Sequence, residues 1–279
     1  GASVEKAPSI VSPSFADILS YENDEVLETI VVGKENVSIS ELIQKLSNSS
    51  WFSQGRQYLD ASEGMCPFCQ QKLPEDFGKQ IEEYFDEVEK ILAKVRETQI
   101  KGIEEAANAI AEAVLKGNNI FIFGASHSGM MAEELVYRAG GFMLINPIFA
   151  PGLSLSERAV NRTSKLERLE GFAKILLESY PVKKGDVLII ASVSGRNPVP
   201  VEMALEAKDK GLTVITLTSL DYSKNVTSRH KSGKKVYELA DIVLDDCCPK
   251  GDAVLQIGKF PQKVAPTSTI AGAYILNSM

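Results

Sequence analysis

Three short segments rich in serine, threonine and glycine contain the residues of this sequence best suited to chemistry. They are GASHSG at residues 124–129, SVSGRN at 192–197 and TLTS at 216–219. Small residues let backbone N–H groups approach an anion, and hydroxyl groups add hydrogen-bond donors without adding charge. Each segment leads toward a predicted helix N-terminus, whose dipole favours negative charge. The segments therefore indicate an anion site, to which Thr218 and Ser219 of the third segment would contribute.

The elements around these segments predict where they lie. Stretches of helical periodicity alternate with short apolar runs at residues 120–123, 142–145, 186–191, 213–217 and 242–244. The predicted helices include one that reaches Arg138 and others at residues 166–180 and 198–210. This alternation is typical of an α/β fold in which helices cover both faces of a parallel sheet. Ligands bind beyond the carboxyl ends of such strands, where all three segments fall. A turn or a cap would account for any one segment alone, but three at one edge favour a binding site.

The chain is predicted to have two parts, residues 1–76 and residues 77–279. The first part lacks the apolar periodicity of an independent core. In the second, apolar residues recur at helical spacing from Phe85 to Val114, as one long helix or as two broken near Gly102. This helical region has more apolar positions than one sheet face needs. We therefore expect part of it to be buried between the subunits of a homodimer.

Composition restricts the class of protein. The 279 residues carry a formal net charge of −7, which argues against a nucleic-acid partner because phosphate backbones select basic surfaces. No apolar run approaches the roughly 18 residues of a membrane span and no signal peptide opens the chain, so a cytoplasmic location without membrane contact is expected. The four cysteines, two of them adjacent, do not have the spacing of a disulfide framework. No cofactor is expected.

The second part of the chain resembles a SIS (sugar isomerase) domain. The residues that carry the resemblance are FGASHSGMMAEELVYRAGG (123–141), LERLEG (166–171), GDVLIIASVSGRNPVPVEMALEAK (185–208), TSRHKSGKKVYELAD (227–241) and APTSTIAGAYILN (265–277). Residues 121–279 are similar to the domain itself, in particular to a bacterial family of stand-alone SIS proteins. Residues 77–115 match the helical lead-in of such domains. The resemblance implies a five-stranded parallel sheet flanked by helices, a homodimer, and a phosphosugar site near the dimer interface.

The resemblance also implies roles for single residues. In SIS domains the loop after the DVLIIA-type strand holds the phosphate group, and its positions correspond here to Ser192, Ser194 and Asn197. The position of Asn197 is usually Ser or Thr, so an amide replaces one hydroxyl group. The first loop lines the sugar site, which implicates Ser126 and Ser128.

A catalytic role is implied for Glu134. The SIS phosphoheptose isomerases carry a similar AEEL segment whose second Glu acts on the substrate, and Glu134 has that position here. Those enzymes also use a His one turn earlier and another on the C-terminal helix. Here the first position is Met130, and no His follows Thr267. Isomerisation of an aldose to a ketose needs a base that moves a proton between adjacent carbons. The alternative for Glu134 is a surface ion pair with Arg138 at the i+4 spacing.

Two histidines are the remaining candidates for proton transfer. His127 lies in the first hydroxyl-rich segment and His230 in the basic run SRHK. Each is either a proton carrier or a structural hydrogen-bonding residue. Glu167 and Glu170 flank Arg168 and are expected on a solvated helix face with ion pairs.

Two functions stay open at the level of the sequence. One is a phosphosugar isomerase or lyase, and the other is a non-catalytic sensor in which sugar binding controls a partner. Turnover of a sugar phosphate would favour the enzyme, and saturable binding without turnover would favour the sensor. The sequence does not identify the sugar.

The first part of the chain has a different resemblance. Residues 14–82 are similar to part of a bacterial AAA-type ATPase related to the anticodon nucleases, on the strength of SFADILSYEN (14–23), VVGKENVSI (31–39) and CPFCQQKLPEDF (66–77). No Walker A sequence is present, so no ATPase activity is implied. Cys66 and Cys69 are zinc candidates, although structural zinc takes four ligands and this pair supplies two. The arrangement is typical of a fusion or of a mis-joined gene model, and we expect the last helix to be cut short by the chain end.

Overall fold

The computed structural model describes residues 65, 71–73, 76–157 and 159–279. The chain divides into two compact units, residues 1–78 and residues 79–279. In the first unit Met65 and Lys72 form an isolated antiparallel bridge, and the zinc candidates Cys66 and Cys69 lie outside the described residues. The second unit contains all the other site residues proposed from the sequence. Within the described ranges, no helix is long and apolar enough to cross a membrane.

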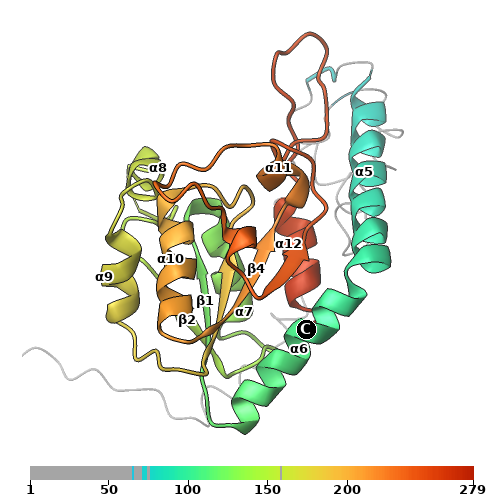
Figure 1. Cartoon of the computed structure of the whole chain (residues 1–279). Coiled ribbons are helices and arrows are strands. Elements are labelled where there is room, and N and C mark those ends of the chain that lie inside the picture. Colours follow the sequence, from blue (N-terminus) through green and yellow to red (C-terminus); the bar gives the residue numbers. More distant parts are fainter. Residues whose placement is uncertain (1–64, 66–70, 74–75, 158) are drawn as a thin grey trace, which may run out of the picture. The chain divides into compact units, whose positions relative to one another are not determined.

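A five-stranded parallel sheet forms the centre of the second unit (Figure 1). In chain order its strands are β1 Ile120–Gly124, β2 Ile145–Ile148, β3 Val187–Ala191, β4 Thr213–Thr218 and β5 Ile242–Asp245. Their order across the sheet is β2-β1-β3-β4-β5, and every neighbouring pair is parallel. The α/β fold predicted from the alternating pattern is confirmed.

The second strand lies later in the chain than the sequence predicts. The apolar run at residues 142–145 predicts a strand, but β2 begins at Ile145 and residues 142–144 are exposed. β2 is an edge strand, paired with β1 alone. Such a strand tolerates a proline, which has no N–H group for the ladder, and Pro147 occupies that position here. The apolar run therefore marks the approach to the strand rather than the strand itself.

Helices surround the sheet, with η denoting a 3-10 helix. They are α5 Phe77–Thr98, α6 Ile100–Leu115, η2 Ser126–Gly129, α7 Met130–Leu135, α8 Asn161–Leu166, α9 Phe172–Glu178, α10 Pro198–Asp209, α11 Leu220–Lys224, η3 Val236–Glu238 and α12 Ser268–Leu276. The helical region before β1 is two helices, and the break is at Gln99, three residues before Gly102. Gly102 lies inside α6, where an added Cβ would be 3.3 Å from Cδ2 of Leu244. Its small size thus lets α6 pack closely against β5.

Two other helices differ from the sequence prediction. Of the helix predicted at residues 166–180, only Phe172–Glu178 forms one, as α9. α8 already ends at Leu166, and the break between the two helices contains Gly171, which has a φ of 83°. The N–H of Gly171 donates to both carboxylate oxygens of Glu202, at 2.8 and 2.7 Å, which fixes this break. The helix predicted to reach Arg138 ends at Leu135, and Val136 is already extended.

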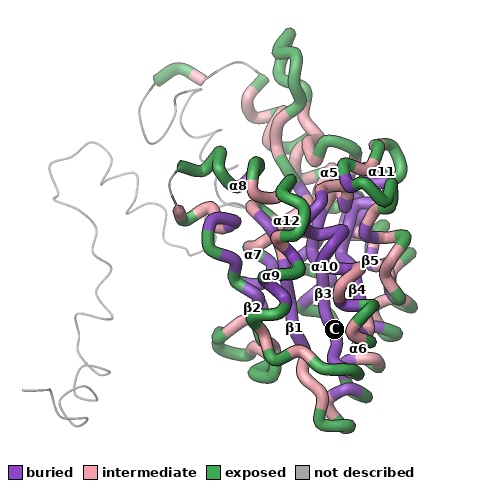
Figure 2. The backbone as a smooth tube through the Cα atoms, turned by 60° about the vertical axis from the view of Figure 1, so that its left-hand side comes forward, coloured by how far each residue is buried: buried purple, intermediate pink, exposed green. Residues whose placement is uncertain are grey.

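Two apolar cores lie on opposite faces of the sheet. Helices α5, α6, α7 and α12 contribute to one core, and α9 and α10 contribute to the other. Successive residues of β3 alternate between them, so that Ile189 belongs to the first core and Ile190 to the second, both fully buried. Figure 2 shows the buried strands inside the exposed loops. Complete burial of one such side chain contributes about 1.5–3 kcal/mol to the stability of the fold. The sheet is therefore a stable scaffold for the loops at its edges.

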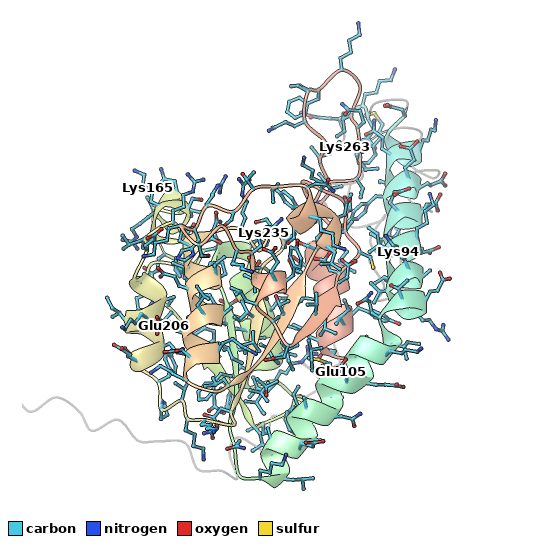
Figure 3. All side chains as sticks on the ribbon, viewed as in Figure 1. Lys94, Glu105, Lys165, Glu206, Lys235 and Lys263 are labelled. Carbon is cyan, nitrogen blue, oxygen red and sulfur yellow. The ribbon has the colours of Figure 1, made fainter. Side chains whose placement is uncertain are left out.

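The connections at the carboxyl edge of the sheet carry the three hydroxyl-rich segments, as the sequence predicts. Figure 3 places Lys165 and Lys235 toward this edge and Glu105 toward the opposite one. β1 and β3 are neighbours, yet the chain runs from β1 to β2 on one side and from β3 to β4 on the other. A crevice for a ligand forms at such a switch point.

Candidate functional site

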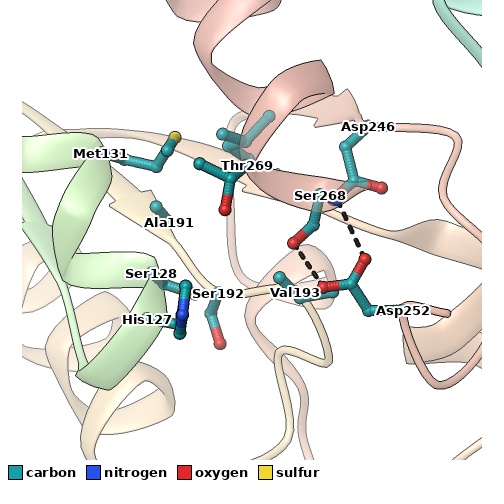
Figure 4. A pocket seen from close by; sticks show the side chains of 11 residues that line it. His127, Ser128, Met131, Ala191, Ser192, Val193, Asp246, Asp252, Ser268 and Thr269 are labelled. Carbon is teal, nitrogen blue, oxygen red and sulfur yellow. Dashed lines mark hydrogen bonds between the residues drawn. The ribbon is translucent and has the colours of Figure 1, made fainter. Parts of the chain in front are cut away.

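A small cavity lies at the switch point between β1 and β3 (Figure 4). It is lined by His127, Ser128, Met131, Ala191, Ser192, Val193, Leu217, Asp246, Asp252, Ser268 and Thr269. Its volume of about 60 Å³ is room for about two water molecules. A ligand would therefore place one polar group in the cavity and extend outward from it.

The loop after β1 reaches the cavity through a tight turn. A Cβ on Gly124 would lie 2.2 Å from the carbonyl oxygen of Ser128, so no larger residue fits without moving the backbone. The N–H of Ser128 donates to the carbonyl of Ala125 at 3.1 Å and closes the turn. The turn places His127 and Ser128 on one side of the cavity (Figure 4). On the opposite side lie Ser268, the first residue of α12, and Asp252, which precedes that helix in the chain.

Ser126 lies on the other side of the same turn. It has a φ of 54°, which is unusual for a residue with a side chain. Its Oγ is buried and has no hydrogen-bond partner among the described residues. It lines a second and larger hollow of about 640 Å³, together with Gly129, Met130, Glu133 and residues 148–157 in part. The two serines of the first segment therefore face different hollows.

The loop after β3 presents a row of unpaired backbone N–H groups. The N–H of Ser192 donates to the carbonyl of Leu217 at 3.0 Å. In the described part of the chain, none of the next five N–H groups, at residues 193–197, donates a hydrogen bond to another residue. Gly195 turns the chain within this row with a φ of 57°. Successive N–H groups around such a turn form a concave anion-binding site.

The third segment holds this loop in place rather than lining the cavity. Thr218 and Ser219 are fully buried. Thr218 Oγ1 donates to the carbonyl of Val193 at 3.0 Å, and Ser219 Oγ donates to the carbonyl of Cys248 at 2.7 Å. The structure thus does not bring these two hydroxyl groups to a ligand. Their hydrogen bonds position the loops that do line the cavity.

Asn197 does not line the cavity either. Its Oδ1 accepts a hydrogen bond from Nη1 of Arg229 at 2.8 Å, and its side chain is hydrogen-bonded to the carboxylate of Glu167. Burial raises the pKa of Glu167, against the opposing effects of Asn197, Arg229 and Arg168. Glu167 is half-buried, whereas the sequence predicts a solvated position. Glu170 is exposed and pairs with Lys231 at 3.1 Å, as expected of a surface carboxylate.

Asp246 is a cavity residue that the sequence analysis missed. It is 2% exposed and follows β5 directly. Burial raises its pKa to about 7, with Asp245 acting in the same direction and the hydrogen bond from the N–H of Cys248 opposing the shift. A carboxyl group that titrates near neutral pH can both donate and accept a proton. The signal in the sequence was a pair of aspartates at the carboxyl end of a buried strand.

Asp252 fixes the start of α12 beside the cavity. Its Oδ1 accepts hydrogen bonds from the N–H groups of Thr267 and Ser268 at 3.0 and 2.9 Å, and its Oδ2 accepts one from Ser268 Oγ at 2.6 Å. These contacts, two of them drawn in Figure 4, occupy both carboxylate oxygens. Asp252 therefore serves to position the helix rather than to carry protons.

Glu134 does not line the cavity. Its carboxylate forms a close ion pair with Arg138 and accepts a hydrogen bond from Nδ2 of Asn277 at 3.0 Å. The ion pair is the alternative that the i+4 spacing indicates. A catalytic role for Glu134 stays a prediction that these contacts do not support.

His230 occupies a third and separate place. It is 7% exposed, with Nδ1 at 2.8 Å from Ser232 Oγ and Nε2 at 3.6 Å from a carboxylate oxygen of Glu202. His230, Glu202 and Glu170 are close enough together to hold a metal ion. However, Glu202 already accepts two hydrogen bonds from Gly171 and Glu170 pairs with Lys231. Of the three catalytic candidates from the sequence, His127 alone lines the cavity.

Comparison with known proteins gives two family matches, which overlap along the chain. The profile of the SIS domain matches residues 83–219, and that of an AAA domain matches residues 2–135. The second match agrees with the ATPase resemblance of the first part.

Among solved structures, a phosphoheptose isomerase from Neisseria gonorrhoeae has a TM-score of 0.48 and 18% identity, covering 72% of this chain and 93% of that one. The sugar isomerase domain of an RpiR transcription factor from Sphaerobacter thermophilus has a TM-score of 0.41 and 17% identity, covering 73% and 89%.

Two relatives are much more similar in sequence. UPF0309 proteins of Oceanobacillus iheyensis and Shouchella clausii are 54% and 49% identical to this chain over 199 residues, which are 71% of this chain and 81% of each relative. At this identity and coverage, the chain belongs to the UPF0309 family of SIS-domain proteins.

Proposed function

We propose that this chain binds a phosphorylated sugar at the switch point between β1 and β3. The observation that carries the proposal is the row of unpaired N–H groups at residues 193–197, beside a cavity that Ser128 and Ser192 help to line. A phosphate group has several acceptor oxygens and needs several donors that converge on it. Such a row provides them in a protein of net charge −7.

The proposed ligand lies across the carboxyl edge of the sheet. Its phosphate group takes the N–H groups around Gly195, with the hydroxyl groups of Ser192 and Ser194 as further donors. The sugar extends toward η2, where Ser128 and His127 contact it. Membership of a SIS-domain family supports this arrangement, since the resemblance implies the phosphate on the same loop.

Proton transfer is the second step of the proposal. The sugar beside η2 would have Asp246 within the same cavity, and this carboxyl group titrates near pH 7. Asp246 is therefore better suited than Glu134 to act as the base of an isomerisation or a related proton abstraction. His127 lines the same cavity and is the second proton-carrying group there.

We further propose that the protein is a cytoplasmic homodimer. Ile100 and Leu115, at the two ends of α6, are 48% and 87% exposed. Large apolar side chains at both ends of one helix fit a surface that a second copy covers.

Binding measurements with one variant test the proposal. Ser194→Asp adds a negative charge to the phosphate loop and should abolish binding of sugar phosphates such as fructose 6-phosphate or glucosamine 6-phosphate in calorimetry. Ser179→Asp is the matched control, because Ser179 is exposed and lies in the connection that enters β3 at the opposite edge. Undiminished affinity in Ser194→Asp would remove the loop from the site. Binding without any turnover would assign the protein to the sensor class.

A further inference from the structure

Three arginines gather beside the proposed phosphate loop and come from three different segments. Arg168 follows α8, Arg196 belongs to the loop between β3 and α10, and Arg229 lies between α11 and η3. Backbone hydrogen bonds hold the segments together. The N–H of Arg229 donates to the carbonyl of Arg196 at 2.8 Å, and the N–H of Val199 donates to the carbonyl of Glu167 at 3.1 Å. These contacts set the backbone positions of the segments that carry the three arginines.

Side-chain contacts fix two of the guanidinium groups. Arg229 Nη1 donates to Asn197 Oδ1 at 2.8 Å, and Arg196 Nη2 donates to Thr227 Oγ1 at 3.3 Å. Both acceptors are uncharged. Arg196 Nε is buried and has no hydrogen-bond partner among the described residues. Arg196 therefore keeps a hydrogen-bond donor that the described residues do not use.

Glu167 offsets the positive charges of this group only in part. In the described part of the chain, none of the three arginines forms an ion pair within 4.0 Å of a carboxylate. The pKa of Arg229 is lowered by burial and by the nearby charges of Arg196 and Arg168. Glu167 is the acidic group that acts electrostatically on Arg229 and Arg168. The other charged groups close by, Glu170 and Lys231, pair with each other.

Concentrated positive charge is unusual in a protein with a net charge of −7. Bringing three guanidinium groups together costs free energy unless an anion offsets their repulsion. Arginine is well matched to the planar, two-oxygen edge of a carboxylate or phosphate group. Arg196 and the acceptor Asn197 are also members of the N–H row at residues 193–197. The arginine group is therefore directly continuous with the proposed phosphate loop.

We propose that the ligand is a phosphorylated sugar with a second anionic group, a carboxylate or another phosphate, which Arg168, Arg196 and Arg229 bind. This inference rests on the proposed function and narrows its substrate class. The first phosphate occupies the N–H row, and the second anionic group lies at the arginines.

Matched pairs of sugars test this inference by calorimetry at fixed ionic strength. Fructose 6-phosphate is compared with fructose 1,6-bisphosphate, and glucose 6-phosphate with 6-phosphogluconate, so that the two arms distinguish a phosphate from a carboxylate. In at least one pair the sugar with the second anionic group should bind at least about tenfold more tightly. The measured quantity is the ratio of the affinities of the two sugars in a pair. A change that weakens the binding of both sugars equally leaves this ratio unaltered.

Arg168→Gln is the variant least able to disturb the fold, because Arg168 is exposed and makes no hydrogen bond through its side chain to a described residue. It should lower the ratio several-fold, and Arg229→Gln should lower it further. Arg162→Gln is the control, since Arg162 is an exposed arginine of α8 paired with Glu157 at 2.7 Å. It should leave the ratio unchanged.

The outcomes separate the two proposals. Equal affinities within both pairs, or ratios that Arg168→Gln and Arg229→Gln leave unchanged, would overturn the inference and leave phosphosugar binding intact. Failure of every phosphorylated sugar to bind would overturn the proposed function and the inference with it.

Discussion

The hydroxyl group of Ser223 donates a hydrogen bond to the carbonyl oxygen of Ser194 at 2.8 Å. Ser223 is fully buried on α11, and its Oγ also lies 2.9 Å from Oγ1 of Thr218. A residue far along the chain thus sets the direction of the peptide group that precedes Gly195. The loop proposed to bind phosphate is therefore shaped by contacts within the protein, independently of any ligand.

Ser223→Ala should weaken this loop. The variant leaves the Ser194 carbonyl without its donor, so we expect a loss of about 1–2 kcal/mol in the free energy of unfolding and about a three- to tenfold weaker affinity for sugar phosphates. Chemical denaturation and calorimetry measure the two effects. The control is Ser278→Ala, which removes an exposed hydroxyl group that donates a hydrogen bond to the Tyr274 carbonyl. It should change the free energy of unfolding and the affinity for sugar phosphates only slightly. Wild-type affinity in Ser223→Ala would show that this contact does not shape the site.

Asp246 should make stability depend on pH in a defined direction. Its pKa in the folded protein is about 7 against an ordinary value of 3.8, so the folded state holds a proton that the unfolded state has lost between these pH values. Stability from this group is fully present below about pH 4 and is lost as the pH rises through 7. The Asp246→Asn variant lacks this dependence. Between pH 5 and 8 its free energy of unfolding should exceed that of the wild type by a few kcal/mol. Urea denaturation at several pH values checks this, and a constant difference between the two proteins would contradict the burial argument.

Two carboxyl groups compete for the role of base, and deuterium exchange distinguishes them. Incorporation of deuterium from heavy water into a bound sugar phosphate is compared for the wild type, Asp246→Asn and Glu134→Gln. Asp246→Asn should lose exchange by at least about a hundredfold, because the group in the cavity is removed. Loss in Glu134→Gln alone would instead support the role that the SIS resemblance implies. Wild-type protein that binds the sugar and exchanges nothing is a sensor.

The proposed homodimer makes a separate prediction. Sedimentation velocity at micromolar concentration should show a dimer, and Ile100→Glu should shift it toward the monomer by placing a charge on the exposed apolar end of α6. Glu105→Gln, a change at an exposed acidic position of the same helix, is the control. A wild-type monomer at this concentration would contradict the proposal.

The sheet and the edge that carries the site could be predicted because short apolar runs between helical stretches are typical of buried parallel strands. The breaks in the helices could not, since Gly171 interrupts its helix through a contact with Glu202 that lies 31 residues later in the chain. Composition likewise does not say which way a hydroxyl group points. Thr218 and Ser128 look alike in sequence, yet one is buried against Val193 and the other lines the cavity.

The carboxyl groups show the same limit. Glu134 could be picked out because it lies in a recognisable segment, whereas Asp246 depends on burial by elements from distant parts of the chain. The role of Asn197 also depends on long-range packing, because its partners Arg229 and Glu167 come from two other loops.

The central claim is that the N–H groups after β3 bind a phosphate group, and amide NMR tests it most directly. The ¹⁵N–¹H signals of residues 193–197 are followed while the protein is titrated with a sugar phosphate, and separately with the same sugar without phosphate. We expect saturable shifts at these amides with the phosphorylated sugar and none with the neutral sugar. Saturable binding of the phosphorylated sugar that leaves these five signals unmoved would contradict it.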